Sequence, residues 1–267
     1  MSPGVYSAKK KNGKIYFRSN ITYHSKHISL GSFLSEQAAS DAYKEANLLL
    51  YDNTISLNQA FAKCNTLNYE KIVILINFRD NHIYLSNPII LQKNYFVYYL
   101  SPTEEYKFDI DDLFYYTTHK ILRRGNSLYV NDYGMQYRIL DKYGIHSHSV
   151  PGRDYKFVNG DPTDLRYSNI RVINPYYGVI NSGDEINPIY NAKIHINGNI
   201  SLGTYDSAEL AAIAYNKACD IAKDCGFIKD YPQNFISSIS PQKYADIYTS
   251  INLPKNFLNY VKYKDFK

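Results

Sequence analysis

Two segments of the chain, about 172 residues apart, repeat one order of hydrophobic and polar positions. In residues 17–24 and 28–30, apolar side chains alternate with polar ones, which is the period of a strand with one buried face. Residues 38–50 change to a helical period with small alanines on one side. Residues 190–205 and 211–222 repeat both patterns. The sequence therefore predicts one sheet-and-helix unit that is used twice.

Turn and capping residues refine this prediction. Gly4-Val5-Tyr6 predicts a third strand in the first copy, and Ser35 is placed to cap its helix. In the second copy, Asn197-Gly198 is typical of a two-residue type I′ turn. Asp206 and Glu209 are spaced as a capping pair for the helix that follows.

Both copies share four short motifs. A Gly-Val pair occurs at Gly4-Val5 and at Gly178-Val179, and Phe17-Arg18-Ser19-Asn20-Ile21 corresponds to Tyr190-Asn191-Ala192-Lys193-Ile194. Leu30-Gly31-Ser32-Phe33 corresponds to Leu202-Gly203-Thr204-Tyr205, and an alanine–tyrosine pattern occurs at 39–46 and at 211–218. Together these motifs resemble the AP2 DNA-binding domain, in the form found in phages, viruses and homing endonucleases, over residues 3–52 and 176–226. In that family a three-stranded sheet lies in the DNA major groove and a helix supports it from behind.

The resemblance implies that outward side chains of the first sheet face DNA: Tyr6, Lys14, Arg18, Asn20, Thr22 and His27. Arginine can bond two acceptors on guanine and asparagine can bond an adenine edge. From Met1 to Ser35 the chain has no Asp or Glu, and its basic residues suit phosphates: Lys9, Lys10, Lys11, Lys14, Arg18 and Lys26. A solvated sheet face is the alternative interpretation.

The second copy carries different charges. Its corresponding outward residues are Asn191, Lys193 and His195, and it has Asp184 and Glu185 where the first copy has lysines. Three alternatives stay open for this copy: weak DNA binding, base recognition with little help from phosphate contacts, and a protein contact surface.

A third motif lies between the copies. Val158-Asn159-Gly160 and the following residues 161–174 resemble the second half of an HNH endonuclease motif. In the alignment that the resemblance gives, the family's metal-binding Asp falls at Lys156 and its general-base His at Phe157. A further family His corresponds to Tyr137. Lysine repels a cation and phenylalanine cannot accept a proton, so the resemblance implies an HNH fold without its chemistry.

Of the HNH set only Asn169 remains, and we expect it to hydrogen-bond within its own loop. The central region has a basic excess, which predicts contact with the DNA backbone by side chains that include Arg138, Lys156, Arg166 and Arg171. The alternative interpretation is that these basic side chains are only solvated and contact no DNA. A metal site displaced to His146 and His148 is the corresponding nuclease alternative.

The rest of the chain gives coarser predictions. Residues 72–76 and 95–100 are typical of buried strands, and a helix is expected to begin at Asp111. Residues 230–235 suit a tail that packs on the second helix. The fold class predicted is α+β, with AP2-like modules at 1–65 and 176–240, a degenerate HNH-like (ββα-metal-like) centre at 66–175 and a helical extension at 241–267.

Composition sets limits on these hypotheses. The chain has 267 residues with 45% hydrophobic content and a net charge of +5, which permits packed cores and suits a nucleic-acid partner. Its three cysteines have no zinc-like spacing, so no metal or other cofactor is expected. No apolar run reaches the ~20 residues that cross a bilayer. The odd cysteine count and the lack of a signal peptide favour a reducing, intracellular location, and packaging in a virion is compatible with it.

The function predicted from the sequence is non-enzymatic binding of double-stranded DNA, for transcriptional regulation or organisation of a viral genome. The alternatives are a metal-dependent HNH nicking endonuclease, and a virion structural protein that uses the same modules for protein contacts.

Overall fold

The structure is a computed structural model that describes residues 3–183 and 186–263. It divides into two compact units, each continuous in space but not in sequence. The N-terminal unit comprises residues 1–139 and 159–169, and the C-terminal unit comprises residues 140–158 and 170–267. The expected central domain at 66–175 is therefore shared between the two units. The coarse prediction of an α+β protein with small antiparallel three-stranded sheets is confirmed.

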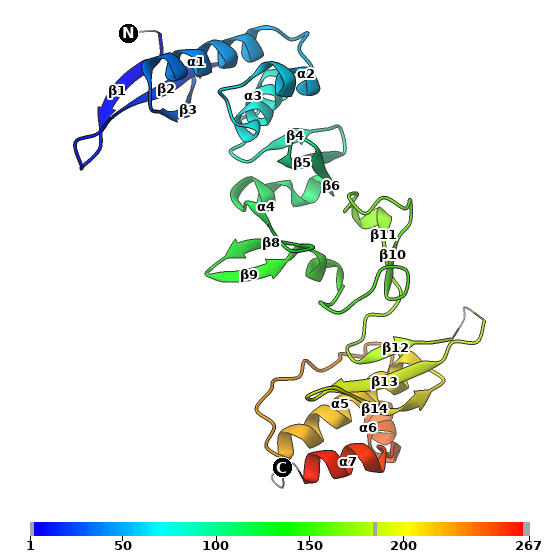
Figure 1. Cartoon of the computed structure of the whole chain (residues 1–267). Coiled ribbons are helices and arrows are strands. Elements are labelled where there is room, and N and C mark those ends of the chain that lie inside the picture. The colour runs from blue at the N-terminus through cyan, green and yellow to red at the C-terminus, as the bar shows by residue number, and fades with distance from the viewer. Residues whose placement is uncertain (1–2, 184–185, 264–267) are drawn as a thin grey trace. The chain divides into compact units, whose positions relative to one another are not determined.

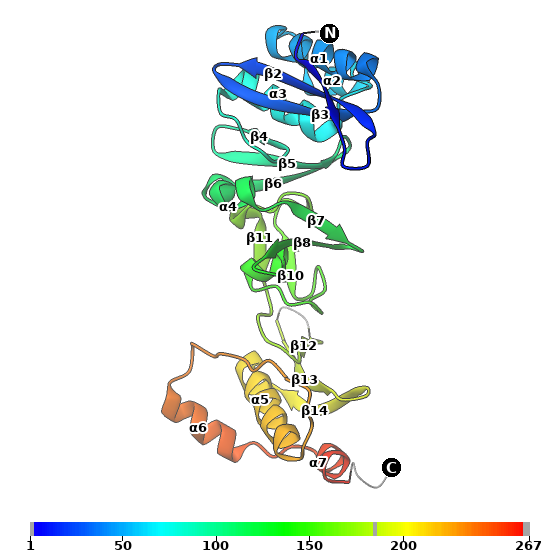
Figure 2. The ribbon, with the colours of Figure 1, turned by 90° about the vertical axis from the view of Figure 1, so that its left-hand side faces the viewer.

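The first sheet has the order β1 (Val5–Lys9), β2 (Ile15–Tyr23), β3 (Lys26–Phe33), and all its strands are antiparallel. Helix α1 (Glu36–Tyr51) packs on β2 and β3, and Figures 1 and 2 show α1 and α3 on the same side of this sheet. The Ser35 hydroxyl accepts a hydrogen bond from the Ala38 amide, so the predicted cap is confirmed. The turn of His24 and Ser25, both with positive φ, joins β2 to β3.

Residues 72–76 form a helix, so the strand predicted there is wrong. They lie in α3 (Tyr69–Asn81), which follows α2 (Leu57–Lys63) and shares a core with α1 and the first sheet. The Glu45 carboxylate on α1 accepts hydrogen bonds from the amides of residues 65–67, just before α3 begins. Near the end of α3, the buried guanidinium of Arg79 donates to the carbonyls of Leu49 and Asp52. These contacts fix α3 against α1 and extend the first module beyond residue 65.

Two further sheets complete the N-terminal unit. One has the order β4 (Ile89–Leu91), β5 (Tyr95–Ser101), β6 (Glu104–Asp109), and the other β7 (Ile121–Arg124), β8 (Ser127–Asp132), β9 (Met135–Arg138). The strand predicted at 95–100 is confirmed as β5. A 3-10 turn, η1 (Ile110–Asp112), precedes α4 (Leu113–Thr118), so the helical segment begins one residue before the predicted Asp111. Residues of η3 (Tyr167–Asn169) also belong to this unit.

The C-terminal unit contains the second copy. Its sheet has the order β12 (Val179–Asn181), β13 (Tyr190–His195), β14 (Asn199–Tyr205), and α5 (Ala208–Asp224) covers one face (Figure 1). Helices α6 (Pro241–Ser250) and α7 (Lys255–Lys262) follow, as the predicted helical extension. Phe257 and Val261 of α7 enter the same core as α5. The predicted tail is also confirmed, since Asn234 and Asn216 of α5 exchange hydrogen bonds.

Two local predictions in the second copy need correction. The pair His195 and Asn199 encloses residues 196–198, so the loop has three residues instead of the two expected at Asn197-Gly198. Within this loop the Ile196 amide donates a hydrogen bond to the Gly198 carbonyl at 2.9 Å. The cap of α5 is Ser207, whose hydroxyl accepts from the Leu210 amide, and not Asp206.

The two copies share a backbone arrangement at the Gly-Val pair that occurs in both. Gly4 and Gly178 have φ values of 69° and 68°, and a Cβ on either would meet a tyrosine ring of the helix and a carbonyl of the middle strand. The Gly4 carbonyl accepts from the Asn20 amide at 2.9 Å, and the Gly178 carbonyl accepts from the Lys193 amide at 2.7 Å. The ladder register shifts at the equivalent position of each middle strand. Sequence repetition therefore corresponds to a structural repeat.

The HNH-like segment gives two short strands, β10 (Tyr155–Phe157) and β11 (Ile170–Val172), which pair antiparallel. Loop 158–169 connects them. The next element after β11 is β12, with no helix in residues 173–178. The ββ part of the predicted ββα order is present, and the α part does not follow it.

Candidate nucleic-acid interface

The outward face of the first sheet holds the strongest candidate site. Along β2, buried Ser19 and Ile21 alternate with Arg18, Asn20 and Thr22, which point away from the helices. Register places Tyr6 beside Arg18 and His27 beside Thr22. The structure thus brings five of the predicted residues onto one side of the sheet.

Few contacts within the protein occupy these groups. The Arg18 guanidinium donates to the Tyr16 hydroxyl at 2.8 Å and lies 5.5 Å from that ring. Such a contact limits the rotamers of the arginine and leaves other N–H donors available, since guanidinium has five. The Thr22 hydroxyl lies 3.4 Å from Nδ1 of His27. Within the described part of the chain, Arg18 forms no ion pair.

Lysines lie at both ends of β2. Lys9 ends β1, and the exposed Lys10, Lys11 and Lys14 surround the following turn, which a bond from the Lys10 amide to the Lys14 carbonyl closes. Lys26 begins β3 at the other end. The eight residue steps of β2 place these cations roughly 26 Å apart. In residues 3–35, which the structure describes completely, none of the lysines forms an ion pair.

On the outward face of the second sheet, more side chains form hydrogen bonds within the protein than on the first sheet. Asn191 donates to the Ser182 hydroxyl at 2.6 Å and accepts from the Thr204 hydroxyl at 2.9 Å. His195 lies 3.0 Å from the Asn199 side chain. Lys193 is half-buried, and Asp184 and Glu185 lie outside the described residues. The predicted trio Asn191, Lys193 and His195 is thus on one face, but two of its members already have polar partners.

The four central residues predicted to contact DNA differ in their surroundings. Lys156 and Arg171 are exposed and directly opposite each other in the β10–β11 ladder of the C-terminal unit. Arg138 is half-buried at the end of β9. Arg166 makes a two-pronged ion pair with the buried Asp164, at 2.8 Å and 2.6 Å. We exclude Arg166 from the candidate interface because its guanidinium already has a buried carboxylate partner.

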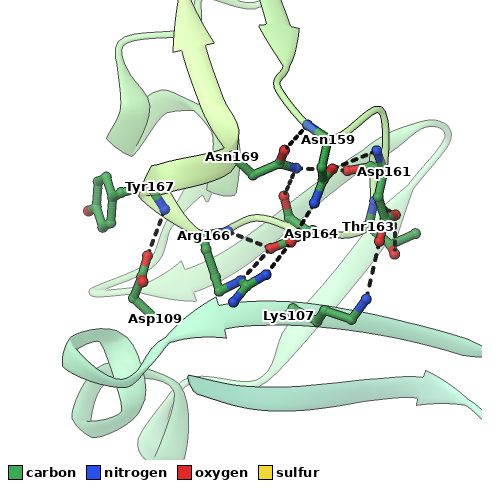
Figure 3. A network of polar contacts seen from close by, with 9 residues as sticks. All are labelled: Lys107, Asp109, Asn159, Asp161, Thr163, Asp164, Arg166, Tyr167 and Asn169. Atoms are coloured by element: carbon green, nitrogen blue, oxygen red, sulfur yellow. Dashed lines mark hydrogen bonds and ion pairs between the residues drawn. The ribbon is translucent and has the colours of Figure 1, made fainter. Parts of the chain in front are cut away.

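Asn169 is a structural residue of the HNH-like loop (Figure 3). Its buried side chain accepts from the Asn159 amide at 2.7 Å and donates to the carbonyls of Asp161 and Asp164 at 3.0 Å and 2.8 Å. The expectation that Asn169 hydrogen-bonds its own loop is therefore confirmed.

The loop also bonds to β6, which the sequence did not predict (Figure 3). Lys107 on β6 donates to the Asp161 carboxylate at 3.2 Å, and the Asp109 carboxylate accepts from the Tyr167 amide at 2.6 Å. Further backbone bonds join Lys107 to Thr163 and Leu165. The network explains why residues 159–169 belong to the N-terminal unit although their flanking strands belong to the other.

Both carboxylates of this loop are held in the ionised form. Burial acts to raise the pKa of Asp164, but hydrogen bonds and the charge of Arg166 outweigh it and lower that pKa below its usual value. Hydrogen bonds from Thr163 are the main cause that lowers the pKa of Asp161, with a contribution from Lys107. Because these protein groups already neutralise them, both carboxylates serve the loop's own structure.

The described residues offer neither a clustered metal-ligand set nor a membrane-spanning helix. Among the residues that the structure describes, no three or more His, Cys, Asp or Glu side chains gather as a metal-binding group. His146 bonds through Nε2 to the Pro175 carbonyl at 2.7 Å and stacks on Tyr177. In the described ranges, no helix has the length and apolar character to span a bilayer.

Comparison of the chain with protein-family models, with curated proteins and with solved structures gave no significant match.

Proposed function

We propose that this chain binds double-stranded DNA without cleaving it, and that the outward face of β1–β3 enters the major groove. One observation supports this most: an exposed sheet face with no acidic residue presents Arg18, Asn20 and Thr22, with lysines at both ends of the middle strand. A two-stranded or broader β-surface of this kind fits the major groove.

The side chains divide into two roles under this proposal. Arg18 and Asn20 have the donor patterns that match guanine and adenine edges, and they lie in the centre of the face. The lysines lie at its ends, where phosphate contacts give affinity and orientation without sequence information. The AP2 resemblance of the sequence agrees with this division.

The proposal assigns no DNA contact to the second sheet. Asn191 has two hydrogen-bond partners there, and Lys193 and His195 line a cavity of the C-terminal unit. Exposed Lys156 and Arg171 are a second candidate for contact with the DNA backbone. DNA binding by these two residues, and by Asn191, Lys193 and His195 of the second sheet, stays a prediction. A second contact on the same chain would raise the effective concentration of the first along a duplex.

Salt dependence tests the phosphate role. Fluorescence anisotropy with a labelled duplex of mixed sequence should show binding that weakens steeply as salt rises. The triple variant Lys9→Gln/Lys10→Gln/Lys11→Gln should reduce the slope of log K against log[salt] by up to about 2.7, which corresponds to three phosphate contacts. Lys93→Gln is the control, because Lys93 is an exposed lysine of the same unit in the β4–β5 turn.

Two outcomes would contradict this role. No binding to any duplex at low salt would favour a structural protein that uses the modules for protein contacts. An equal slope for the triple variant and Lys93→Gln would show that the lysine turn does not meet phosphates.

Base recognition needs a separate test. Arg18→Ala should lower discrimination between selected and scrambled duplexes by about 1–3 kcal/mol, while nonspecific binding persists through the lysines. Selection from a random duplex pool supplies the preferred sequence. If the variant selects the same sequence with the same preference, Arg18 does not contact a base.

We further propose that the HNH-like region lacks nuclease activity, because Lys156 and Phe157 stand at the positions that the resemblance gives to the metal ligand and base. Supercoiled plasmid incubated with Mg²⁺ or Mn²⁺ should stay intact. Nicking that needs the metal, co-purifies with the wild-type protein and disappears in His146→Ala/His148→Ala would establish the enzyme alternative.

A further inference from the structure

The C-terminal unit contains an open cavity of about 500 Å³ beside the second sheet. Its walls come from the loop 146–149 with residues 153–154, from the segment 174–178, from strands β12, β13 and β14, from Tyr215 of α5 and from the tail 229–232. The volume lies in the range of sites for small molecules, roughly 300–1,000 Å³, and is too small for a folded partner.

One side of the cavity is cationic. Lys193 and His195 project from the same face of β13, roughly 7 Å apart along the strand. The Lys229 ammonium reaches the same place, where it donates to the His195 carbonyl at 3.2 Å. Within the described residues, neither lysine forms an ion pair. This side therefore offers positive charge that protein carboxylates do not neutralise.

The acidic residue among the described lining does not cancel this charge. Asp154 is buried and accepts from the Val150 amide at 2.7 Å, from the Arg153 guanidinium at 2.7 Å and from the Asn174 amide group at 3.2 Å. Its carboxylate is thus satisfied by Val150 and Arg153 of its own loop and by Asn174. A ligand with negative charge would therefore meet two lysines that form no ion pair, and the Asp154 carboxylate already has hydrogen-bond donors.

The remaining lining is aromatic and apolar. The rings of His146 and Tyr177 stack with a centroid separation of 3.6 Å, and the His146 bond to the Pro175 carbonyl fixes this pair in place. Tyr231 and Ile180 add further ring and apolar surface. Rigid aromatic walls favour a planar ligand group, since they lose little conformational freedom on contact.

We propose that this cavity binds a nucleoside monophosphate or an equivalent phosphorylated base. The phosphate contacts Lys193, His195 and Lys229, and the base packs against the wall that Tyr177 and Ile180 form. Neither part alone fits the lining, because a bare phosphate leaves the aromatic wall exposed to water and an uncharged base leaves the two lysines without a negatively charged partner. The proposal does not depend on DNA binding by the first sheet, which belongs to the other unit.

Isothermal titration of the full chain at low salt tests this inference with AMP, adenosine and inorganic phosphate as probes. AMP should bind saturably, and adenosine and phosphate should each bind at least about tenfold more weakly. The double variant Lys193→Gln/Lys229→Gln should weaken AMP binding by about tenfold or more. Lys243→Gln/Lys255→Gln is the matched control, because it removes two exposed lysines of the same unit outside the cavity lining.

A second variant tests the cavity through shape. Ile180→Trp places a large ring in it and should abolish AMP binding, while hydrogen exchange of the C-terminal unit verifies that the variant is folded. Arg18→Ala should leave AMP binding unchanged, so failure of the DNA proposal and failure of this one are separable. Absence of saturable AMP binding up to about 10 mM would overturn the inference. Equal affinity for phosphate and AMP, or equal loss in the control, would overturn it as well.

Discussion

Replacement of Asn169 by alanine tests whether this residue is structural. The substitution removes one acceptor and two donors from the loop 159–169. The Asn159 amide and the carbonyls of Asp161 and Asp164 then lose their partner at a site where Asn169 is only 3% exposed. Each bond contributes roughly 0.5–1.5 kcal/mol, and a buried group without a partner costs more. We expect the free energy of unfolding of the N-terminal unit to fall by about 2–4 kcal/mol.

Urea denaturation followed by far-ultraviolet circular dichroism measures this change, with hydrogen exchange of the peptide 159–169 as a local readout. The two compact units need not unfold together, so the exchange data assign the loss to the correct unit. Asn94→Ala is the control, since Asn94 is an exposed asparagine of the β4–β5 turn in the same unit. The folded fraction of Asn169→Ala should bind duplex DNA as the wild type does. A loss below about 1 kcal/mol would refute the structural role.

Two other predictions concern stability. Gly178→Ala should destabilise the C-terminal unit by about 2 kcal/mol or more, because φ is 68° there and the new Cβ would lie 2.0 Å from the Tyr215 ring and 2.6 Å from the Lys193 carbonyl. Gly226→Ala is the control in thermal melting, because Gly226 also has a positive φ but a Cβ there would meet no atom within 4 Å, so the difference between the two variants measures the clash. The lowered pKa of Asp164 means that its contribution to stability is complete above the unfolded value of about 3.9 and is lost as pH falls through the folded value. In an acid titration followed by circular dichroism, Asp164→Asn should lose stability less steeply below about pH 4 than the wild type does. Identical curves for the two proteins would contradict the prediction.

The sequence predicted the two modules well because their information is local. The alternation in 17–24 and 28–30, the alanine face of 38–50 and the Ser35 cap each depend on neighbours within a few residues, and the structure reproduces all three. The helix α3 was missed for a physical reason. It is buried along 72–79, so its apolar run has neither helical nor strand periodicity, and β-branched residues then favour a strand.

The candidate sites divide in the same way. Outward residues of β2 were predictable because strand period alone places them on one face. The roles of Lys107 and Asp109 were not, since each meets residues more than fifty positions away in the sequence. The pairing of Arg166 with Asp164 spans only two residues and could have been weighed, because Asp-x-Arg in a tight loop allows that contact. The cavity of the C-terminal unit is lined by several segments that lie far apart in the sequence, and no sequence pattern predicts that they meet.

The backbone arrangement that the two copies share allows their sheets to carry different outward side chains. In each copy a glycine at the start of the first strand contacts a helix tyrosine and bonds to the middle strand next to its register shift. These contacts involve the backbone and the buried face, so they place no demand on outward side chains. Arg18 and Asn191 occupy equivalent outward positions, and only the second has two side-chain partners within its sheet. One scaffold can therefore hold an open face in the first copy and the wall of a cavity in the second.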